Sequence, residues 1–186
     1  MKENKQIIQS ASLTQFFFKT LTEVNHRSVC PVPEELILYS SQVLDQYALS
    51  ENFYQINEGK VNEKVLGMSY LEAHTMSRID RKRTYKDIGD SVLVQLGLFS
   101  DRVKSKAVNE SYYIDLGRSS YEKMGRLNCS FYDIPNFYLQ LSTSFEYLIK
   151  LLMIMNEKNK FNSFEDYLIE QNECSPIISP SKFKAS

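Results

Sequence analysis

The feature that most constrains the fold is a long run of apolar side chains at helical spacing towards the C-terminal end of the chain. Between residues 135 and 156, apolar residues recur every three or four positions, at Phe137, Tyr138, Leu141, Phe145, Leu148, Ile149, Leu152, Met153 and Met155. A helix that is apolar over so wide an arc is usually central in a bundle. The pattern predicts one long helix from about Pro135 to Asn156, with other helices packed around it.

The rest of the chain also favours helix over strand. Glycine and proline are few, at 6 and 5 residues, and no short segment alternates cleanly between apolar and polar side chains. We therefore expect an all-α, single-domain bundle of about six helices over residues 1–172, with a flexible C-terminal tail over residues 173–186. Helical spacing predicts the other helices at 12–25, 33–49, 64–79, 81–98 and 109–126, with a short additional one at 163–171. Residues 50–63 are predicted to form a polar loop, and 99–102 a turn.

Two positions in the fourth predicted helix leave alternatives open. The apolar run VLVQL at 92–96 also fits a buried strand, although helical flanks favour helix. Asp90 enters this run and is either the N-cap of the following apolar helix, which is the common case, or a partly buried carboxylate that needs an Arg or Tyr partner.

Overall charge and cysteine content point to a soluble cytoplasmic protein. With 22 Lys and Arg against 23 Asp and Glu, the net charge of -1 gives no global field that would attract nucleic acid. Three widely separated cysteines, without a CxxC pair, are typical of reduced thiols. The most apolar passage, at 145–155, is too short to span a bilayer. We therefore expect neither nucleic-acid binding nor a membrane span.

Sequence motifs give little support for catalysis. The common signatures of dinucleotide, nucleotide, zinc and calcium sites are missing, so we expect no metal, cofactor or catalytic residue. His26 is suited to stabilising a helix C-terminus, and His74 has no carboxylate on its own helical face to orient it. A small enzyme that uses His74 or a cysteine, Cys30, Cys129 or Cys174, is the lowest-ranked hypothesis.

The most charged passage is SRIDRKRTYKDIGD, residues 77–90, which holds five cations and three aspartates. Mixed charge along a helix is typical of a solvated surface, and this is the favoured interpretation. A sharper alternative is that Arg78 and Arg81 share one helical face and form a fork for a phosphate or for a partner's carboxylates. Further cations at 102–126 make the middle of the chain positive.

A combined pattern spans residues 84–126: GD at 89–90, LxxxGLF at 93–99 and YYxxLGxxxY at 112–121. It resembles a pattern of uncharacterised bacterial proteins. The resemblance implies a bacterial, cytosolic, helical protein, and it implies no activity, cofactor or site.

The leading functional hypothesis is a non-catalytic regulatory or protein-interaction module that acts through a positively charged, Tyr-containing helical surface. The alternative is a helical sensor of a phosphate-bearing ligand such as a nucleotide, with Arg78, Arg81 and Tyr85 around the phosphate. Partners are thus another protein or a small ligand, and a homodimer is also expected from the wide apolar arcs. Tyrosines at helical spacing lie more often in the core than at an interface, so a contact role for Tyr112, Tyr113 and Tyr121 is a hypothesis. The candidate contact residues are Arg78, Arg81, Tyr85, Tyr112, Tyr113, Arg118 and Tyr121.

Overall fold

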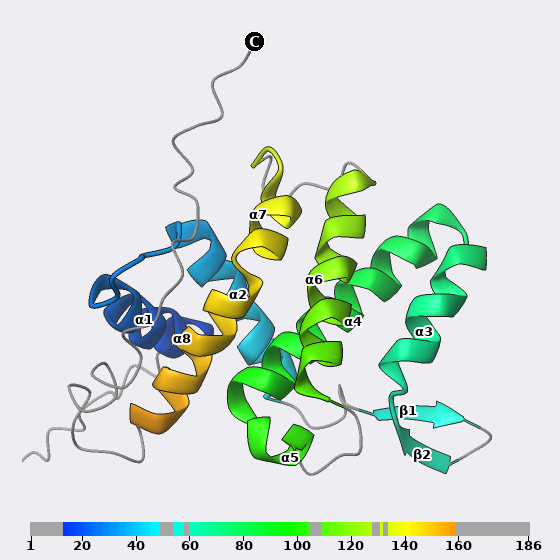
Figure 1. Ribbon diagram of the computed structural model, residues 1–186, viewed down its shortest axis with the longest axis horizontal. Coiled ribbons are helices and arrows are strands. Elements are labelled where there is room, and N and C mark those ends of the chain that lie inside the picture. Colours follow the sequence, from blue (N-terminus) through cyan, green and yellow to red (C-terminus); the bar gives the residue numbers. More distant parts are fainter. Residues whose placement is uncertain are drawn as a thin grey trace, which may run out of the picture.

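The computed structural model describes residues 13–48, 54–57, 60–104, 109–127, 131 and 134–158, with side chains given outside the two strands, Arg102, Lys104 and Lys158. Within these ranges the fold is all-α, as predicted, with one short β-hairpin (Figure 1). The elements are α1 (Leu13–His26), α2 (Glu34–Tyr47), β1 (Tyr54–Asn57), β2 (Lys60–Glu63), α3 (Leu66–Glu72), the 3₁₀ turn η2 (Ala73–Thr75), α4 (Arg78–Leu98), α5 (Ser100–Lys104), α6 (Glu110–Arg126), α7 (Phe137–Thr143) and α8 (Phe145–Lys158).

The centre of the molecule is α4, which packs against α2, α6 and α8. Figure 1 shows α1, α2 and α8 on one side of it and α3 with the hairpin on the other. Every residue of α4 from Ile88 to Gly97 is buried. Glycines allow its neighbours to come close, because a Cβ at Gly97 would lie 2.5 Å from Leu152 Cβ. The C-terminal half of α4 is therefore enclosed by other helices on all sides.

Several helix predictions are confirmed by the structure. Residues 92–96 are helical rather than a strand, and α6 begins after Asn109, whose side chain accepts a hydrogen bond from the Ser111 backbone N–H. Asp90 is not an N-cap, because α4 runs through it without a break. Its side chain is instead enclosed in the core, which is the second alternative that the sequence left open.

The predicted helix over 64–79 is wrong in its second half. The chain turns out of helical conformation at Met76 and Ser77 and re-enters it at Arg78. Ser77 is the N-cap of α4, because its Oγ accepts a hydrogen bond from the Asp80 backbone N–H at 3.2 Å. The charged passage therefore begins a new helix with a defined cap.

The predicted long helix over 135–156 is interrupted once. Asn136, in the left-handed region at φ 56°, precedes α7, and Ser144 separates α7 from α8. The interruption is slight, since the Leu148 N–H still donates to the Ser144 carbonyl at 2.9 Å. The apolar stripe thus continues across two helices.

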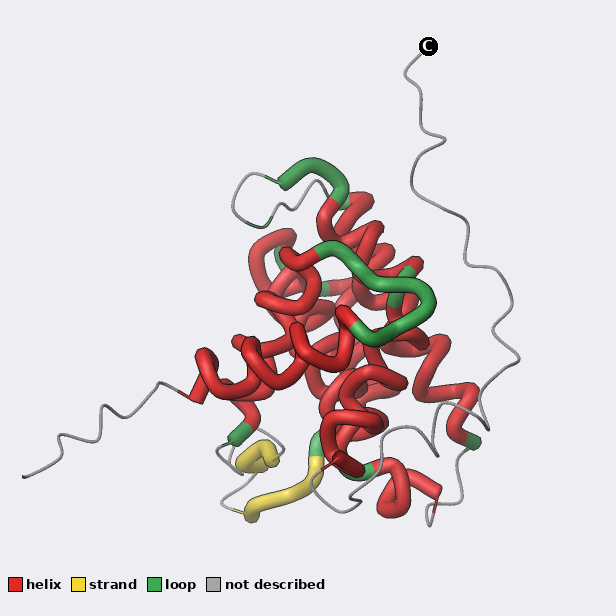
Figure 2. Tube along the Cα trace, turned by 90° about the vertical axis from the view of Figure 1, so that its left-hand side faces the viewer, coloured by secondary structure: helices red, strands yellow, loops and turns green. Residues whose placement is uncertain are grey.

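Two predicted loops are partly ordered elements. Within 50–63 the strands β1 and β2 pair antiparallel, with Tyr54 opposite Glu63 and Asn57 opposite Lys60. The predicted turn at 99–102 contains the first residues of α5. Figure 2 shows the two strands at the edge of the helical body. The predicted short helix at 163–171 and the predicted tail lie outside the described residues.

Candidate functional site

The first unusual feature is a carboxylate in the core. Asp90, on α4, has only 1% of its surface exposed. Its Oδ1 accepts hydrogen bonds from the hydroxyls of Tyr39 on α2, at 2.8 Å, and Tyr121 on α6, at 2.7 Å. Its Oδ2 lies 2.5 Å from Nζ of Lys86, one turn earlier on α4. The carboxylate thus joins three helices through three donors.

Burial governs the electrostatics of this cluster. It raises the pKa of Asp90, while the Lys86 ammonium and the hydrogen bonds from Lys86 and the two phenols act in the opposite direction. The pKa values of Tyr39 and Tyr121 are raised by burial first and by the neighbouring Asp90 second. Both phenols therefore remain protonated donors. The Lys86 ammonium also lies 5.3 Å from the centre of the Tyr39 ring, in a cation–π contact.

A second polar cluster lies one turn nearer the start of α4, at Asp87. Tyr47, at the end of α2, donates to Asp87 Oδ1 at 3.0 Å and also lies 2.6 Å from Ser91 Oγ. Lys64, directly after β2, donates to both Asp87 carboxylate oxygens at 2.9 Å. Burial, and then the charge of Asp87, raise the pKa of Tyr47. The Asp87 carboxylate thus binds both Tyr47 and Lys64, which lie on either side of the segment that contains the hairpin.

The predicted arginine fork is engaged in structural hydrogen bonds. The Arg81 guanidinium donates to the backbone carbonyls of Ala73, His74 and Met76 at 2.9 to 3.1 Å. It therefore helps to satisfy the carbonyls at the end of η2, where the Ala73 carbonyl also accepts from the Met76 N–H at 3.3 Å. Arg78 donates to the carbonyl of Leu127, just after the end of α6, at 3.2 Å. The two side chains thus hold different elements.

The predicted tyrosines divide between core and surface. Tyr85 and Tyr121 are fully buried, so neither lies on the contact surface proposed from the sequence. Tyr85 packs against Tyr70, with ring centres 5.4 Å apart. Tyr112 is exposed and Tyr113 half-buried, and their rings lie edge to face at 5.7 Å. The tyrosine part of the predicted surface is therefore reduced to the start of α6.

Cations on α6 lie close to acidic side chains. Arg118 is 3.4 Å from Asp115 and 3.8 Å from Glu146, and Arg126 is 2.6 Å from Glu122. Exposed pairs of this kind contribute little to stability, about 0.3 to 0.5 kcal/mol each on a helix. They do, however, reduce the positive field that this helix presents. Two of the three cations of α6 are therefore paired within the molecule, and Lys123 is the third.

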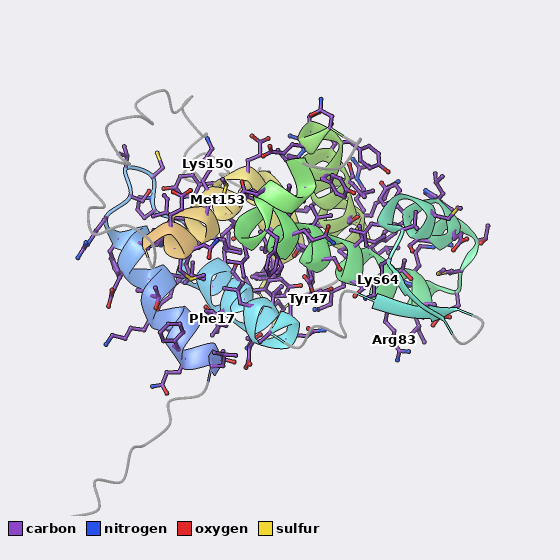
Figure 3. The ribbon with its side chains drawn as sticks, turned by 90° about the horizontal axis from the view of Figure 1, so that it is seen from below. Phe17, Tyr47, Lys64, Arg83, Lys150 and Met153 are labelled. Carbon is purple, nitrogen blue, oxygen red and sulfur yellow. The ribbon has the colours of Figure 1, made fainter. Side chains whose placement is uncertain are left out.

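A different group of side chains remains available on α4. We call Ile79, Lys82 and Arg83 the α4 outer face, because residues spaced by three and four positions lie together on a helix. Ile79 is 65% exposed, Arg83 is exposed and Lys82 is half-buried. Among the residues that the structure describes, neither Lys82 nor Arg83 has an ion pair. Figure 3 shows Arg83 extending away from the helices.

The acidic residues near this face are already engaged. The Asp80 carboxylate accepts a hydrogen bond from the Ser77 hydroxyl at 2.6 Å, and Asp87 is paired with Lys64. The α4 outer face therefore combines an exposed apolar side chain with two cations whose charge is not locally paired. The sequence pointed to Arg78 and Arg81, and only the structure shows that these two are engaged within the molecule whereas Lys82 and Arg83 have no ion pair among the described residues.

Among the described residues, the catalytic candidates His74 and Cys30 make no contact with each other. Exposed His74 makes ring contacts with Tyr70 and Tyr85, at centroid distances of 6.1 and 6.4 Å. Cys30 is half-buried and has a free thiol, whereas Cys129 and Cys174 lie outside the described residues. Across the described part of the chain, no three His, Cys, Asp or Glu side chains are arranged to hold a metal ion.

Comparison of the chain with protein-family models, with curated proteins and with solved structures gives no match in any of the three. Among the helices that the structure describes, none is both long enough and apolar enough to cross a bilayer. Any functional proposal for this chain therefore rests on the site geometry described above.

Proposed function

We propose that this protein is a non-catalytic interaction module that binds an acidic partner through the α4 outer face. The observation that supports this most strongly is the contrast among the cations of the basic middle region. Arg78, Arg81 and Lys86 are bound to groups within the molecule, whereas Lys82 and Arg83 have no ion pair among the described residues. A bacterial, cytoplasmic setting comes from the sequence resemblance, and a regulatory role is part of the proposal.

The chemistry of the face defines the kind of partner. Two unpaired cations favour carboxylates, and the planar guanidinium of Arg83 suits bidentate binding in particular. The exposed Ile79 side chain offers an apolar contact of the kind that interfaces bury at their centre. An acidic segment that also carries apolar side chains matches both features. A phosphate-sensing alternative is less well supported, because Arg81 already donates to three carbonyls.

The proposal is tested with a peptide of defined sequence. Fluorescence anisotropy would follow a labelled, acetylated octapeptide of four Glu-Val repeats added to the full-length protein. We expect saturable binding that weakens as salt is raised, because exposed charges are screened. Lys82→Glu/Arg83→Glu should reduce the affinity at least about tenfold, equivalent to about 1.4 kcal/mol.

The matched control is Arg118→Glu/Arg126→Glu, which makes the same change in charge on α6. Both arginines there lie close to acidic partners, so this variant should keep most of the affinity. Equal losses in the two variants would show that net charge, rather than the α4 outer face, governs binding. Absence of binding to the wild-type protein would refute the proposal.

A further inference from the structure

The chain contains an acidic segment shortly after α8, which ends at Lys158. We call residues 163–173, SFEDYLIEQNE, the acidic segment; they lie outside the described residues. The segment has no Lys or Arg, and it combines the carboxylates of Glu165, Asp166, Glu170 and Glu173 with the apolar side chains of Phe164, Tyr167, Leu168 and Ile169. An acidic chain with apolar side chains is the kind of partner that the chemistry of the α4 outer face defines.

The end of α8 lies close to the end of α4. Asn156 Nδ2 donates to the carbonyl of Leu98, the last residue of α4, at 3.1 Å. From Leu98 back to Arg83, α4 extends over about 22 Å, at a rise of about 1.5 Å per residue. An extended chain covers at most about 3.3 to 3.6 Å per residue, so Glu170 can lie up to about 40 Å from Lys158. The acidic segment is therefore long enough to reach the α4 outer face of its own molecule.

The charges around Lys82 favour an acidic chain at this face. At the spacings of helix neighbours, three and four residues away, Lys82 has Arg78 and Lys86 but no Asp or Glu. Arg83 follows directly and has no ion pair among the described residues. Ile79 lies one turn before both cations and is 65% exposed. A chain with acidic and apolar side chains therefore gains charge pairing and apolar contact at one place.

Lys19 on α1 and Lys150 on α8 are exposed cations on two other helices, which pack against each other. Each has a glutamate at the spacing of a helix neighbour. Glu23 lies four residues after Lys19, and Glu146 lies four residues before Lys150. Opposite charges at this spacing attract each other. The charge of these two lysines is thus offset on their own helices, which favours the α4 outer face as the site for the acidic segment.

We propose that the acidic segment binds the α4 outer face of its own molecule and competes there with an acidic partner. This inference rests on the proposed function and names the regulation of the same surface. Carboxylates of the segment pair with Lys82 and Arg83, and its apolar side chains cover Ile79. A ligand tethered by a short linker acts at an effective concentration of about millimolar, so even weak contacts keep the surface occupied. The partner then binds by displacing the segment.

The first measurement tests this competition in the full-length chain. The four carboxylates would be neutralised together by Glu165→Gln, Asp166→Asn, Glu170→Gln and Glu173→Gln. The neutralised variant should bind the octapeptide of four Glu-Val repeats about tenfold more tightly than the wild type does, because apparent affinity falls in proportion to the fraction of molecules in which a surface is free. Equal affinities in the two proteins would overturn the inference and leave the proposed function standing. Absence of binding to either protein would refute the proposed function itself.

A spin label gives an independent readout of where the segment lies. In the full-length chain, Cys30→Ser/Cys129→Ser leaves Cys174, directly after the segment, as the one thiol for a nitroxide label. Backbone amide signals of residues 79–83 should then be broadened in NMR spectra. Spin-labelled protein mixed with isotope-enriched protein that carries no spin label should show no such broadening, because contact within one molecule does not reach another. Broadening in the mixture alone would assign the contact to a second copy and overturn the inference.

Charge reversal on two surfaces identifies the binding face of the segment. In the spin-labelled protein, Lys82→Glu/Arg83→Glu should remove the broadening. Lys19→Glu/Lys150→Glu is the matched control, with the same change in charge on α1 and α8, and should leave the broadening unchanged. Loss of the broadening in the control variant, with none in the α4 variant, would contradict binding at the α4 outer face.

Discussion

The two halves of α4 differ sharply in their surroundings. From Arg78 to Asp87 only Tyr85 is buried, whereas from Ile88 to Gly97 every residue is buried. Both halves contain aspartates. In the buried half, Asp90 joins α2 and α6 by accepting hydrogen bonds from Tyr39 and Tyr121. The exposed half has Lys82 and Arg83 without ion pairs among the described residues. The comparison indicates that the charge of Asp90 serves the fold, whereas Lys82 and Arg83 are the cations of the first half that are left for the proposed binding.

The largest effect is expected from Asp90→Leu. This change removes the acceptor of the Tyr39 and Tyr121 hydroxyls, and a buried donor without a partner costs about 1 to 3 kcal/mol. We expect a loss of about 2 to 5 kcal/mol in the free energy of unfolding, measured in urea. Asp80→Leu in the exposed half is the control, with an expected loss of no more than about 1 kcal/mol. Similar losses in both variants would contradict the distinction between the halves.

The next largest effect is expected from Gly89→Ala. A Cβ at this position would lie 2.6 Å from Cε1 of Tyr121, and that ring is held by its hydrogen bond to Asp90. Overpacking of this kind costs about 1 to 3 kcal/mol, partly offset by the better helix propensity of alanine. Thermal unfolding should therefore show a lower Tm for the variant. A Tm equal to or above that of the wild type would mean that the ring moves freely.

A pH-dependent effect is expected from Asp90→Asn. Burial raises the pKa of Asp90 in the folded protein above its ordinary value of 3.8. The folded state therefore favours the protonated carboxyl, and this contribution to stability is present at low pH and is lost as pH rises through the folded pKa. Asparagine does not titrate but still accepts from both phenols. The free energy of unfolding of the wild type, relative to that of the variant, should therefore fall as pH rises from about 3.8 through the folded-state pKa of Asp90. Urea titrations at several pH values would measure this difference. A difference that does not vary with pH would show that Asp90 is not the titrating group.

The smallest effect on stability is expected from Lys82→Ala/Arg83→Ala. Substitutions at such surface positions usually change stability by no more than about 0.5 kcal/mol. The same variant should lose affinity for the Glu-Val peptide, since both unpaired cations are removed. Chemical denaturation and anisotropy on one preparation would measure both quantities. A destabilised variant with unchanged affinity would reverse the roles assigned to the two halves.

The helical fold was predictable because apolar spacing is a local property that survives in the structure. Val92 and Leu96, for example, keep the helical phase of α4 although the run around them also fits a strand. Breaks were harder to predict, since Ser77 caps α4 through a bond to the Asp80 N–H and Ser144 interrupts the stripe without any proline or glycine. The hairpin was missed because its strands are short: β1, YQIN, alternates in polarity over only four residues, and β2, KVNE, has a single apolar residue.

The candidate site was predictable only in part. The sequence identified the charged passage and foresaw that Asp90, if buried, would need a Tyr or Arg partner. It could not identify Tyr39, which is 51 positions away, or show that Arg81 donates to η2 carbonyls. Such pairings depend on how helices pack, and helical spacing does not encode them. Tyr121 was singled out as a surface anchor, whereas its hydroxyl binds Asp90 in the core.

Reversal of charge preference tests the central claim most directly. Wild-type protein and Lys82→Glu/Arg83→Glu would each be titrated with the octapeptide of four Glu-Val repeats and with a basic octapeptide of four Lys-Val repeats. If the α4 outer face is the binding surface, the wild type binds the acidic peptide, and the variant loses it and gains the basic one. The same peptide preference in both proteins, with both folded, would contradict the account.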